Sequence, residues 1–218
     1  MDDSPLTKGE RTRHEILAAA RRLFLSQGFT ATPMRQIARE VGITPAAIYN
    51  HYPSKDGLFT ALLQSAAPYD ELFALFGEIE AGTPEDFVRQ VFRAVLAFIT
   101  DHQDYLQLVL IDAQERDGSA VATLLPEVLP RALVWHERLV SLGAGQQHGE
   151  VLRKEVPFLV FVRALVSLLG GFMLTQRIVK EDRVPEFTSI DWPEALANVF
   201  LYGVFRTPAG DARGVAGK

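Results

Sequence analysis

Hydrophobic residues recur every three or four positions along most of this chain, which is the spacing of a helix with one buried face. Within residues 8–27, for example, one side of such a helix carries Ile16, Ala20, Leu23 and Phe24. Nowhere do apolar and polar residues alternate over a stretch long enough to predict a sheet. We therefore predict an all-α protein.

Two short helices are predicted after the first one. Thr32 is expected to cap the second helix, with Pro33 in its first position, and Gly42 is expected to end it in a tight turn. Thr44 and Pro45 repeat the same start signal and open a third helix. This pattern of helix, glycine turn and helix is the one by which a compact domain inserts a helix into the DNA major groove.

The third helix is expected to present one face to solvent or to DNA. Pro53 stops this helix, and Ile48 and Tyr52, four residues apart, are its predicted inward side chains. The remaining positions then face outward: Thr44, Pro45, Ala46, Ala47, Tyr49, Asn50 and His51. The alternative for each of these residues is that water alone surrounds it.

The outward residues divide by chemistry. Small side chains at Pro45, Ala46 and Ala47 would allow the backbone to approach base edges closely and to touch thymine methyl groups, and Asn50 could read a base or bind the backbone. Phosphate oxygens suit the polar groups of Thr44, Tyr49, His51 and Lys55. Proline has no side-chain hydrogen-bonding group, so hydrogen-bonded readout is not expected at Pro45.

Longer helices are predicted beyond the fourth one, which is capped by Ser54 and runs from Lys55 to about Ser65. One of them opens at residues 83–86 and continues at least to Phe98, and the others have the approximate ranges 105–113, 128–142, 157–179 and 191–205. We predict a helix-turn-helix domain over residues 1–54, a helical effector-binding and dimerisation domain over residues 55–206, and a flexible tail over residues 207–218.

The distribution of charge supports a nucleic-acid partner for the first part of the chain only. The whole chain has a net charge of -5, which alone would argue against such a partner. Residues 1–55, however, hold eight basic and five acidic residues, a net charge of +3, and the remainder holds 14 basic and 22 acidic residues, a net charge of -8. A basic module joined to an acidic body is consistent with DNA contact through the module.

Several stretches in residues 11–63 resemble the N-terminal domain of the tetracycline-repressor (TetR) family. The matching stretches are residues 16–24 (ILAAARRLF), 28–29 (GF), 34–38 (MRQIA), 41–43 (VGI) and 48–55 (IYNHYPSK). The resemblance covers about a quarter of the chain in order and spacing. It implies a homodimeric transcription factor, usually a repressor, which binds operator DNA and whose larger C-terminal domain binds a small-molecule inducer.

The same resemblance supports the assignments on the third helix. The family's base contacts correspond to Pro45, Ala46 and Ala47. Its phosphate contacts correspond to Thr44, Tyr49, His51 and Lys55.

No motif names the effector, but apolar and aromatic residues are plentiful in the C-terminal part. We predict that the effector site includes Phe98, Tyr105, Leu108, Asp112 and Trp135. Asp112 shares a helix face with Tyr105 and Leu108, where an unpaired charge would be costly, so it is the predicted anchor for a cationic or hydrogen-bonding effector. The alternative is that Asp112 pairs with an arginine such as Arg163 or lies at a helix end.

Small residues on the helix over 157–179 predict a helix–helix contact between two copies of the chain. The expected dimer interface combines this strip with apolar residues of the last helix: Ser167, Gly170, Gly171, Leu174, Leu196, Val199, Phe200 and Val204. The alternative is close packing within one subunit. Arg163 interrupts the apolar run, so we expect a buried or dimer-forming helix and no membrane contact.

Other kinds of function find little support in the sequence. The chain has no cysteine, which excludes disulfides, cysteine–zinc sites and thiol nucleophiles and suits a reducing cytoplasm. Its histidines have no metal-ligand spacing, so no metal and no cofactor are predicted. The alternatives left open are an interaction protein without DNA activity and, less favoured, a small helical enzyme using Asp112, Glu115, His102 or His136.

Overall fold

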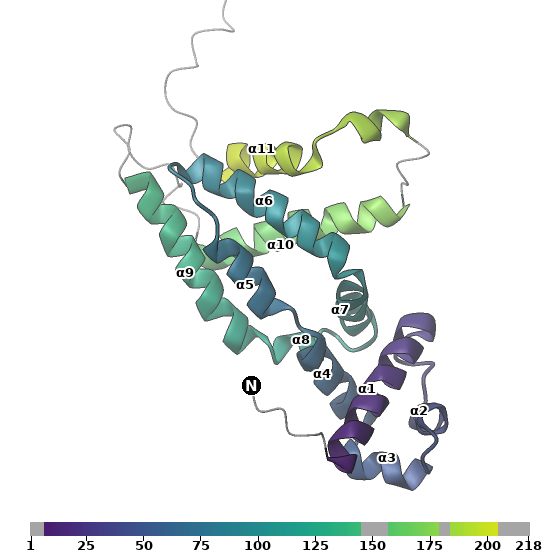
Figure 1. Ribbon diagram of the computed structural model, residues 1–218. Helices are drawn as coiled ribbons and strands as arrows, with labels where there is room; N and C mark the ends of the chain where they lie inside the picture. Colours follow the sequence, from purple (N-terminus) through teal and green to yellow (C-terminus); the bar gives the residue numbers. More distant parts are fainter. Residues whose placement is uncertain (1–6, 145–156, 179–183, 205–218) are drawn as a thin grey trace, which may run out of the picture. The chain divides into compact units, whose positions relative to one another are not determined.

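The structure, a computed structural model, describes residues 7–144, 157–178 and 184–204 (Figure 1). All regular elements in these residues are helices, which confirms the all-α prediction. The α-helices are α1 (Lys8–Gln27), α2 (Met34–Val41), α3 (Pro45–His51), α4 (Lys55–Ala66), α5 (Tyr69–Gly77), α6 (Pro84–Asp101), α7 (Gln103–Glu115), α8 (Ser119–Ala122), α9 (Leu125–Ala144), α10 (Phe158–Ile178) and α11 (Trp192–Val204). One 3-10 helix, η2, spans Pro185–Ser189.

The helices form two compact units, each built from two separate stretches of the chain. The first unit comprises Met1–Pro68 and His102–Val128 and contains α1–α4, α7 and α8. The second comprises Tyr69–Asp101 and Leu129–Lys218 and contains α5, α6, α10, η2 and α11. Helix α9 begins in the first unit and continues in the second. The functional division at residues 54 and 206 stays a prediction, and the predicted tail lies outside the described residues.

Local capping explains where the first helices begin and end. Helix α1 starts with a reciprocal capping box, in which the Thr7 hydroxyl accepts from the backbone N–H of Glu10 and the Glu10 carboxylate accepts from the backbone N–H of Thr7. After α3, Ser54 accepts from the backbone N–H of Gly57 at 2.9 Å and so caps α4, as expected.

The start of α2 differs from the sequence prediction. Pro33, not Thr32, is the capping residue, and it makes no side-chain cap. The Thr32 hydroxyl is fully buried, donates to the carbonyl oxygen of Gly28 at 2.7 Å and accepts from Nε2 of Gln27 at 3.0 Å. Thr32 therefore stabilises the turn after α1, because its hydroxyl hydrogen-bonds to residues of that turn and of the end of α1.

An aromatic cluster joins the helices of the first unit. The ring centroids of Phe24 and Phe29 lie 5.7 Å apart, those of Phe24 and Phe59 5.1 Å, and those of Phe29 and Phe59 5.4 Å. Around them lie fully buried aliphatic side chains from α1 to α4, among them Ile16 and Ile37. Burial of each such side chain contributes about 1.5–3 kcal/mol to the stability of the folded chain.

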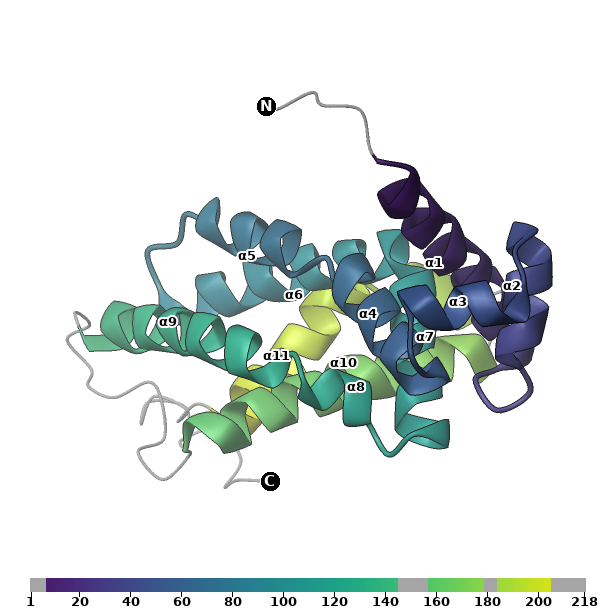
Figure 2. The same cartoon turned by 90° about the horizontal axis from the view of Figure 1, so that it is seen from below.

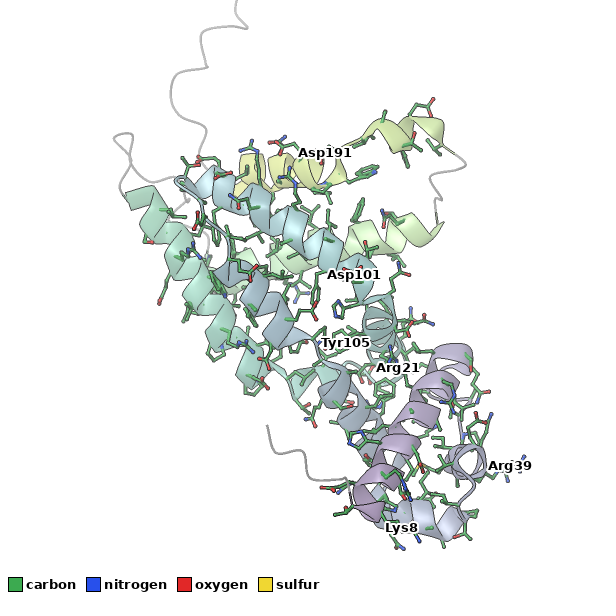
Figure 3. All side chains as sticks on the ribbon, viewed as in Figure 1. Lys8, Arg21, Arg39, Asp101, Tyr105 and Asp191 are labelled. Atoms are coloured by element: carbon green, nitrogen blue, oxygen red, sulfur yellow. The ribbon has the colours of Figure 1, made fainter. Side chains whose placement is uncertain are left out.

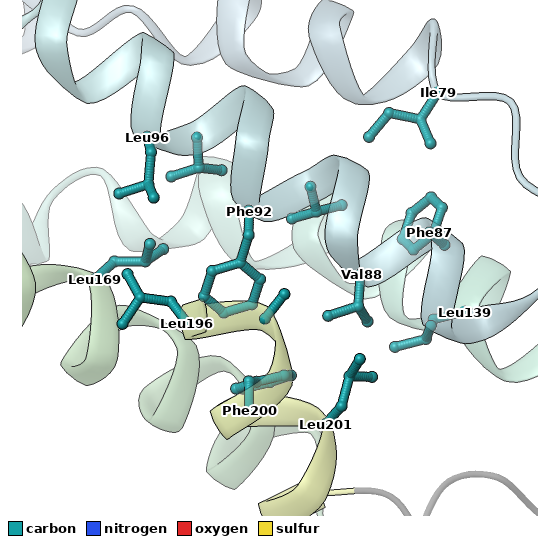
Figure 4. Packing of buried hydrophobic residues seen from close by; sticks show 13 residues of the cluster. Ile79, Phe87, Val88, Phe92, Leu96, Leu139, Leu169, Leu196, Phe200 and Leu201 are labelled. Carbon is teal, nitrogen blue, oxygen red and sulfur yellow. The ribbon is translucent and has the colours of Figure 1, made fainter. Parts of the chain in front are cut away.

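The core of the second unit lies between α6, α10 and α11. Figure 4 shows Phe92 of α6 directed toward Leu196 and Phe200 of α11, and the Phe92 and Phe200 ring centroids are 5.5 Å apart. Phe161 of α10 contacts the same Phe200 ring at 5.3 Å. At the edge of this core, the guanidinium of Arg89 donates to the carboxylate of Glu194 at 2.7 Å.

Helix α10 is apolar but poorly covered by its own chain. Residues Phe158–Gln176 are long and apolar enough to cross a membrane by length and composition, yet only 11% of the window is buried. A single helix of this kind is weak evidence for a membrane span, because helices covered by protein pass the same test. Val166 and Leu174 are 62% and 50% exposed, respectively, so the helix leaves an apolar face without cover from the described residues.

Candidate nucleic-acid interface

Helices α2 and α3 are joined by the tight turn that the sequence predicts. Gly42 ends α2 with φ 78° and ψ 27°, a left-handed conformation that glycine adopts at little cost. The backbone N–H of Gly42 donates to the carbonyl of Arg39, and the N–H of Ile43 donates to that of Ala38 at 3.0 Å. These bonds end α2 and turn the chain within two residues toward the start of α3. Figure 2 shows α2 and α3 next to each other beside α1.

The inward face of α3 is buried, and Arg13 binds the C-terminal end of the helix. Ile48 is fully buried and Tyr52 is 6% exposed, as the spacing predicts. At the helix end, Nη2 of Arg13 donates to the carbonyl of His51 at 3.3 Å, and the Arg13 guanidinium lies 5.4 Å from the centre of the Tyr52 ring. Arg13 therefore binds the C-terminal end of α3, where the helix dipole favours a positive charge.

The opposite face of α3 is open. Thr44, Pro45, Ala46 and Asn50 are exposed, while Ala47 and His51 are half-buried. The side chain of Tyr49 is 50% exposed, a large exposed fraction for an aromatic residue. The structure thus gathers most of the predicted DNA contacts on one short helix.

Thr44 has a double use at the start of α3. Its hydroxyl oxygen accepts from the backbone N–H of Ala47 at 3.1 Å and so caps the helix. The hydroxyl hydrogen is not needed for this bond, so it can donate to an external phosphate oxygen. The cap and the predicted phosphate contact are therefore compatible.

Lys55 has a different environment from the one expected. Its Nζ donates to the carbonyl of Phe29 at 2.8 Å and to that of Thr30 at 3.4 Å, and lies 4.2 Å from the centre of the Phe29 ring. Burial lowers the pKa of Lys55, while Asp56 and Glu115 act in the opposite direction. The ammonium thus binds the turn between α1 and α2, 26 residues earlier in the chain. In this position it is engaged by backbone carbonyls and does not extend toward solvent as a phosphate ligand would.

Glu115, at the end of α7, binds the same turn. Its Oε2 accepts from the backbone N–H of Thr30 at 2.6 Å. The bond to Thr30, more than the nearby Lys55 ammonium, lowers the pKa of Glu115. At Gly28 the φ of +84° disfavours any residue with a side chain, and a Cβ there would lie 2.6 Å from Oε1 of Glu115, so the Glu115 carboxylate would have to move. Glu115 and Lys55 together hold the turn that precedes the helix-turn-helix.

Sequence reasoning did not single out two exposed cations on α2. Arg35 and Arg39 are four residues apart, both exposed, and neither forms an ion pair within the described residues. Figure 3 shows Arg39 projecting outward from α2. Their position opposite the buried Met34, Ile37 and Ala38 was the available signal, and they make further candidates for phosphate contact.

The residues predicted to bind an effector are divided between the two units. Tyr105, Leu108 and Asp112 are buried on α7 in the first unit, and Phe98 and Trp135 belong to the second. Trp135 is half-buried, with its ring centroid 5.7 Å from that of Phe76.

Asp112 is completely buried and already has partners. It accepts from Nη1 of Arg116 at 2.7 Å and from the backbone N–H groups of Ala120 and Val121 at 3.0 and 2.9 Å. Arg116 also forms an ion pair with Asp56 at 3.2 Å. The environment of Asp112 therefore agrees with the alternative given above, in which this carboxylate pairs with an arginine near a helix end. The arginine is Arg116 instead of Arg163.

The predicted dimer-interface residues fall into two groups. Ser167, Gly170, Gly171 and Leu174 on α10 and Val199 on α11 are exposed. Leu196 and Phe200 instead lie in the core of the second unit, 9% and 4% exposed, and so are already covered by their own chain. The side chain of Val204 lies outside the described residues.

Comparisons with known proteins agree on the N-terminal region. The profile of the family described as "Bacterial regulatory proteins, tetR family" matches residues 16–62, which include α2, α3 and most of α1 and α4. The chain is 28% identical to the HTH-type transcriptional regulator TcmR of Streptomyces glaucescens over 92% of this chain and 89% of TcmR. It is 26% identical to the HTH-type transcriptional repressor BepR of Brucella suis over 77% of this chain and 82% of BepR.

Other similarities are partial or concern the fold alone. The match to YerO of Bacillus subtilis, an uncharacterized HTH-type transcriptional regulator, has 29% identity and covers 46% of this chain but only 35% of YerO. The crystal structure of NalD, described as the secondary repressor of the MexAB-OprM multidrug efflux pump in Pseudomonas aeruginosa, is similar with a TM-score of 0.62 and 22% identity. That match covers 91% of this chain and 99% of NalD, so it extends the similarity in fold to nearly the whole chain.

Proposed function

Because this chain belongs to the tetR family of bacterial regulatory proteins, we propose that it is a transcriptional repressor that binds operator DNA as a homodimer and leaves it when a small molecule binds. The relatives reported above are regulators, not enzymes. We assign it to the bacterial cytoplasm, where its DNA is located.

The open face of α3 is the observation that carries the DNA-binding role. A capped helix with small residues in its first turn, followed by an exposed tyrosine and asparagine, suits entry into the major groove. In this proposal Pro45, Ala46, Ala47 and Asn50 contact bases, and Thr44, Tyr49 and His51 contact phosphates. Arg35 and Arg39 add charge on the neighbouring helix. Lys55 acts chiefly by holding the turn before α2 and contacts phosphate only if it leaves that turn.

We infer dimerisation from the exposed apolar face of α10, which a second copy of the chain would remove from water. Its exposed valine and leucine side chains and its two adjacent glycines allow a second helix to pack closely. A two-fold dimer would present two α3 helices, and such proteins read half-sites about one helical turn of DNA apart or more. The operator is therefore expected to be palindromic.

Release by an effector requires a difference in affinity between two states. A small molecule weakens DNA binding only to the extent that it binds the DNA-free arrangement more tightly. In tetR-family regulators the larger C-terminal part takes the effector, and we assign that role to the second unit.

Selection from a pool of random DNA duplexes, followed by titration of the selected site at several salt concentrations, tests the proposal. A palindromic consensus with affinity that falls steeply with salt is the expected result, because phosphate contacts release counterions. If the selection enriches no sequence at low salt, or if the protein binds all duplexes with equal affinity, the protein is not a sequence-specific repressor.

A further inference from the structure

The second unit contains a buried imidazole nitrogen that no group of the described residues satisfies. Nε2 of His136, on α9, is inaccessible to solvent and has no hydrogen-bond partner within residues 7–144, 157–178 and 184–204. The imidazole centroid lies 5.3 Å from that of Phe158 and 5.2 Å from that of Phe161, with both phenyl rings nearly perpendicular to it. Buried polar atoms of native proteins nearly always have a partner, so an unsatisfied one beside two aromatic rings points to an external hydrogen-bonding group.

Of the two rings that cover this nitrogen, Phe161 packs against Phe200 at the edge of the core, whereas Phe158 contacts His136 from outside the core cluster. Phe158 and Phe161 are half-buried and lie in the first turns of α10. Between them, Leu159 and Val160 are 63% and 53% exposed, respectively. Rotation of the Phe158 side chain would therefore give an incoming molecule access to Nε2 of His136 and leave the contact between Phe161 and Phe200 intact.

Charge in the second unit argues against a cationic occupant. Two arginines of α9 already lie over aromatic rings of this unit: Arg138 is 5.3 Å from the centres of Phe87 and Trp135, and Arg131 is 4.3 Å from that of Phe73. The only fully buried carboxylate among the described residues, Asp112, belongs to the first unit. Among the described residues of the second unit, a cation would thus find no buried counter-ion, and it would meet the positive charge of two arginines on α9.

The state of the imidazole also argues against an anion. Burial lowers the pKa of His136, and the nearby Glu137 carboxylate opposes this only in part. The ring is therefore neutral at neutral pH and offers a single donor or acceptor at Nε2. A hydroxyl group suits either tautomer, because it can both donate and accept.

We propose that His136 Nε2 is the hydrogen-bonding anchor of an effector site in the second unit that takes an uncharged, largely aromatic molecule carrying a hydroxyl group. The site rests on the proposed function, for which it names the ligand class. It replaces the cationic effector expected at Asp112, whose carboxylate is fully engaged by Arg116 and two backbone N–H groups.

Three probes of similar size test the ligand class on the full chain by calorimetric titration. These are 2-naphthol, 2-methylnaphthalene, which lacks the hydroxyl, and 2-naphthylmethylammonium, which carries a charge. We expect 2-naphthol to bind about tenfold more tightly than either of the others, which corresponds to about 1.4 kcal/mol. In parallel, two-bond ¹H–¹⁵N spectra should show the His136 Nε2 resonance shift with 2-naphthol and stay in place with 2-methylnaphthalene.

Two substitutions separate an anchoring role from a structural one. His136→Phe should weaken 2-naphthol about tenfold and leave 2-methylnaphthalene within about twofold, while His136→Gln, which keeps a hydrogen-bonding group, should retain most of the difference between the probes. His14→Gln on the exposed surface of α1 is the matched control and should change neither. Equal loss for both probes in His136→Phe would mean that His136 only supports packing, and the proposal would be wrong.

DNA binding is measured separately on the same proteins, so the two proposals can fail independently. If the selected operator binds but none of the three probes binds saturably, the effector site is refuted while the repressor function stands. If 2-naphthol binds through His136 but no DNA sequence is selected, the site stands as a binding site and the repressor function fails.

Discussion

At the scale of single residues, Tyr49 and Lys55 show how similar predictions lead to different tests. Both were expected to contact phosphate, but Tyr49 is half-exposed on α3, and the ammonium of Lys55 binds the backbone between α1 and α2. Removing the Tyr49 hydroxyl with Tyr49→Phe should weaken operator binding about fivefold, or roughly 1 kcal/mol, because one hydrogen bond is lost. Fluorescence anisotropy with the selected duplex measures this, and unchanged affinity would remove Tyr49 from the interface.

For Lys55 the structure predicts a loss of stability. Lys55→Met keeps the aliphatic stem and removes the ammonium donor from the carbonyls of Phe29 and Thr30, so the free energy of unfolding should fall by about 1–3 kcal/mol. The salt dependence of DNA affinity should stay the same. A slope that instead becomes shallower by about one per subunit would show that Lys55 does contact phosphate.

Asp112 gives the largest expected effect of a single substitution. Asp112→Ala leaves the nearly buried Arg116 without its short ion pair and two backbone N–H groups without an acceptor, so it should destabilise the chain by about 3–5 kcal/mol. Asp104→Ala on the same helix is the matched control, since its pair with Arg21 is exposed and should contribute less than about 1 kcal/mol. Urea unfolding compares the two, and similar small losses would contradict the assigned role.

Residues whose role depends on nearby sequence could be predicted. Gly42, Thr44 and Ser54 form caps and turns with partners three or four residues away, and each does so as expected. Lys55 could not be assigned in the same way, because its partners are the carbonyls of Phe29 and Thr30, and no local pattern encodes which carbonyl a lysine reaches. For Asp112, the arginine four residues later was an available local signal, whereas the bonds to the N–H groups of Ala120 and Val121 depend on the course of the backbone after α7.

At the scale of helices, Glu115 links the end of α7 to the turn between α1 and α2. Glu115→Gln should lower the stability of the chain at neutral pH, because the charged acceptor of the Thr30 N–H is lost. The pKa of Glu115 is lowered in the folded chain, so its contribution is present above the pKa of the unfolded state. It disappears as the pH falls through the folded pKa.

The stability difference between the wild type and Glu115→Gln should therefore shrink on acidification below the ordinary range of a glutamate. Thermal unfolding at several pH values measures this difference. A difference that stays constant from neutral to acidic pH would show that the charge of Glu115 is not what holds the turn.

Helix α11 shows what an apolar pattern leaves open. Its sequence is apolar on nearly every side, so periodicity alone could not tell which residues face the core and which face a partner. The structure assigns Leu196, Phe200 and Leu201 to the core and leaves Val199 61% exposed. The existence of the helix, and its start near Asp191 with the Glu194 N–H bound to the Asp191 carboxylate, were predictable from local signals.

At the scale of the whole molecule, the exposed face of α10 predicts a dimer. Val166→Arg places a charge on this face and should convert the dimer to a monomer, with a large loss of operator affinity. Val134→Arg on α9, at a similarly exposed valine, is the control and should leave both properties unchanged. Analytical ultracentrifugation measures the mass, and a dimer that survives Val166→Arg would place the interface elsewhere.

The composition of the first unit has a consequence for protein engineering. Since residues 102–128 belong to the same compact unit as α1 to α4, a fragment that ends at residue 54 or 68 is not expected to fold as an independent helix-turn-helix domain. A hybrid regulator that joins such a fragment to a foreign sensor would lack Glu115 and Arg116 against the turn and the Phe29–Phe59 cluster. Exchanging the two stretches together, with the junctions at the ends of α4 and α6 and in the first turn of α9, respects the way in which the chain is assembled.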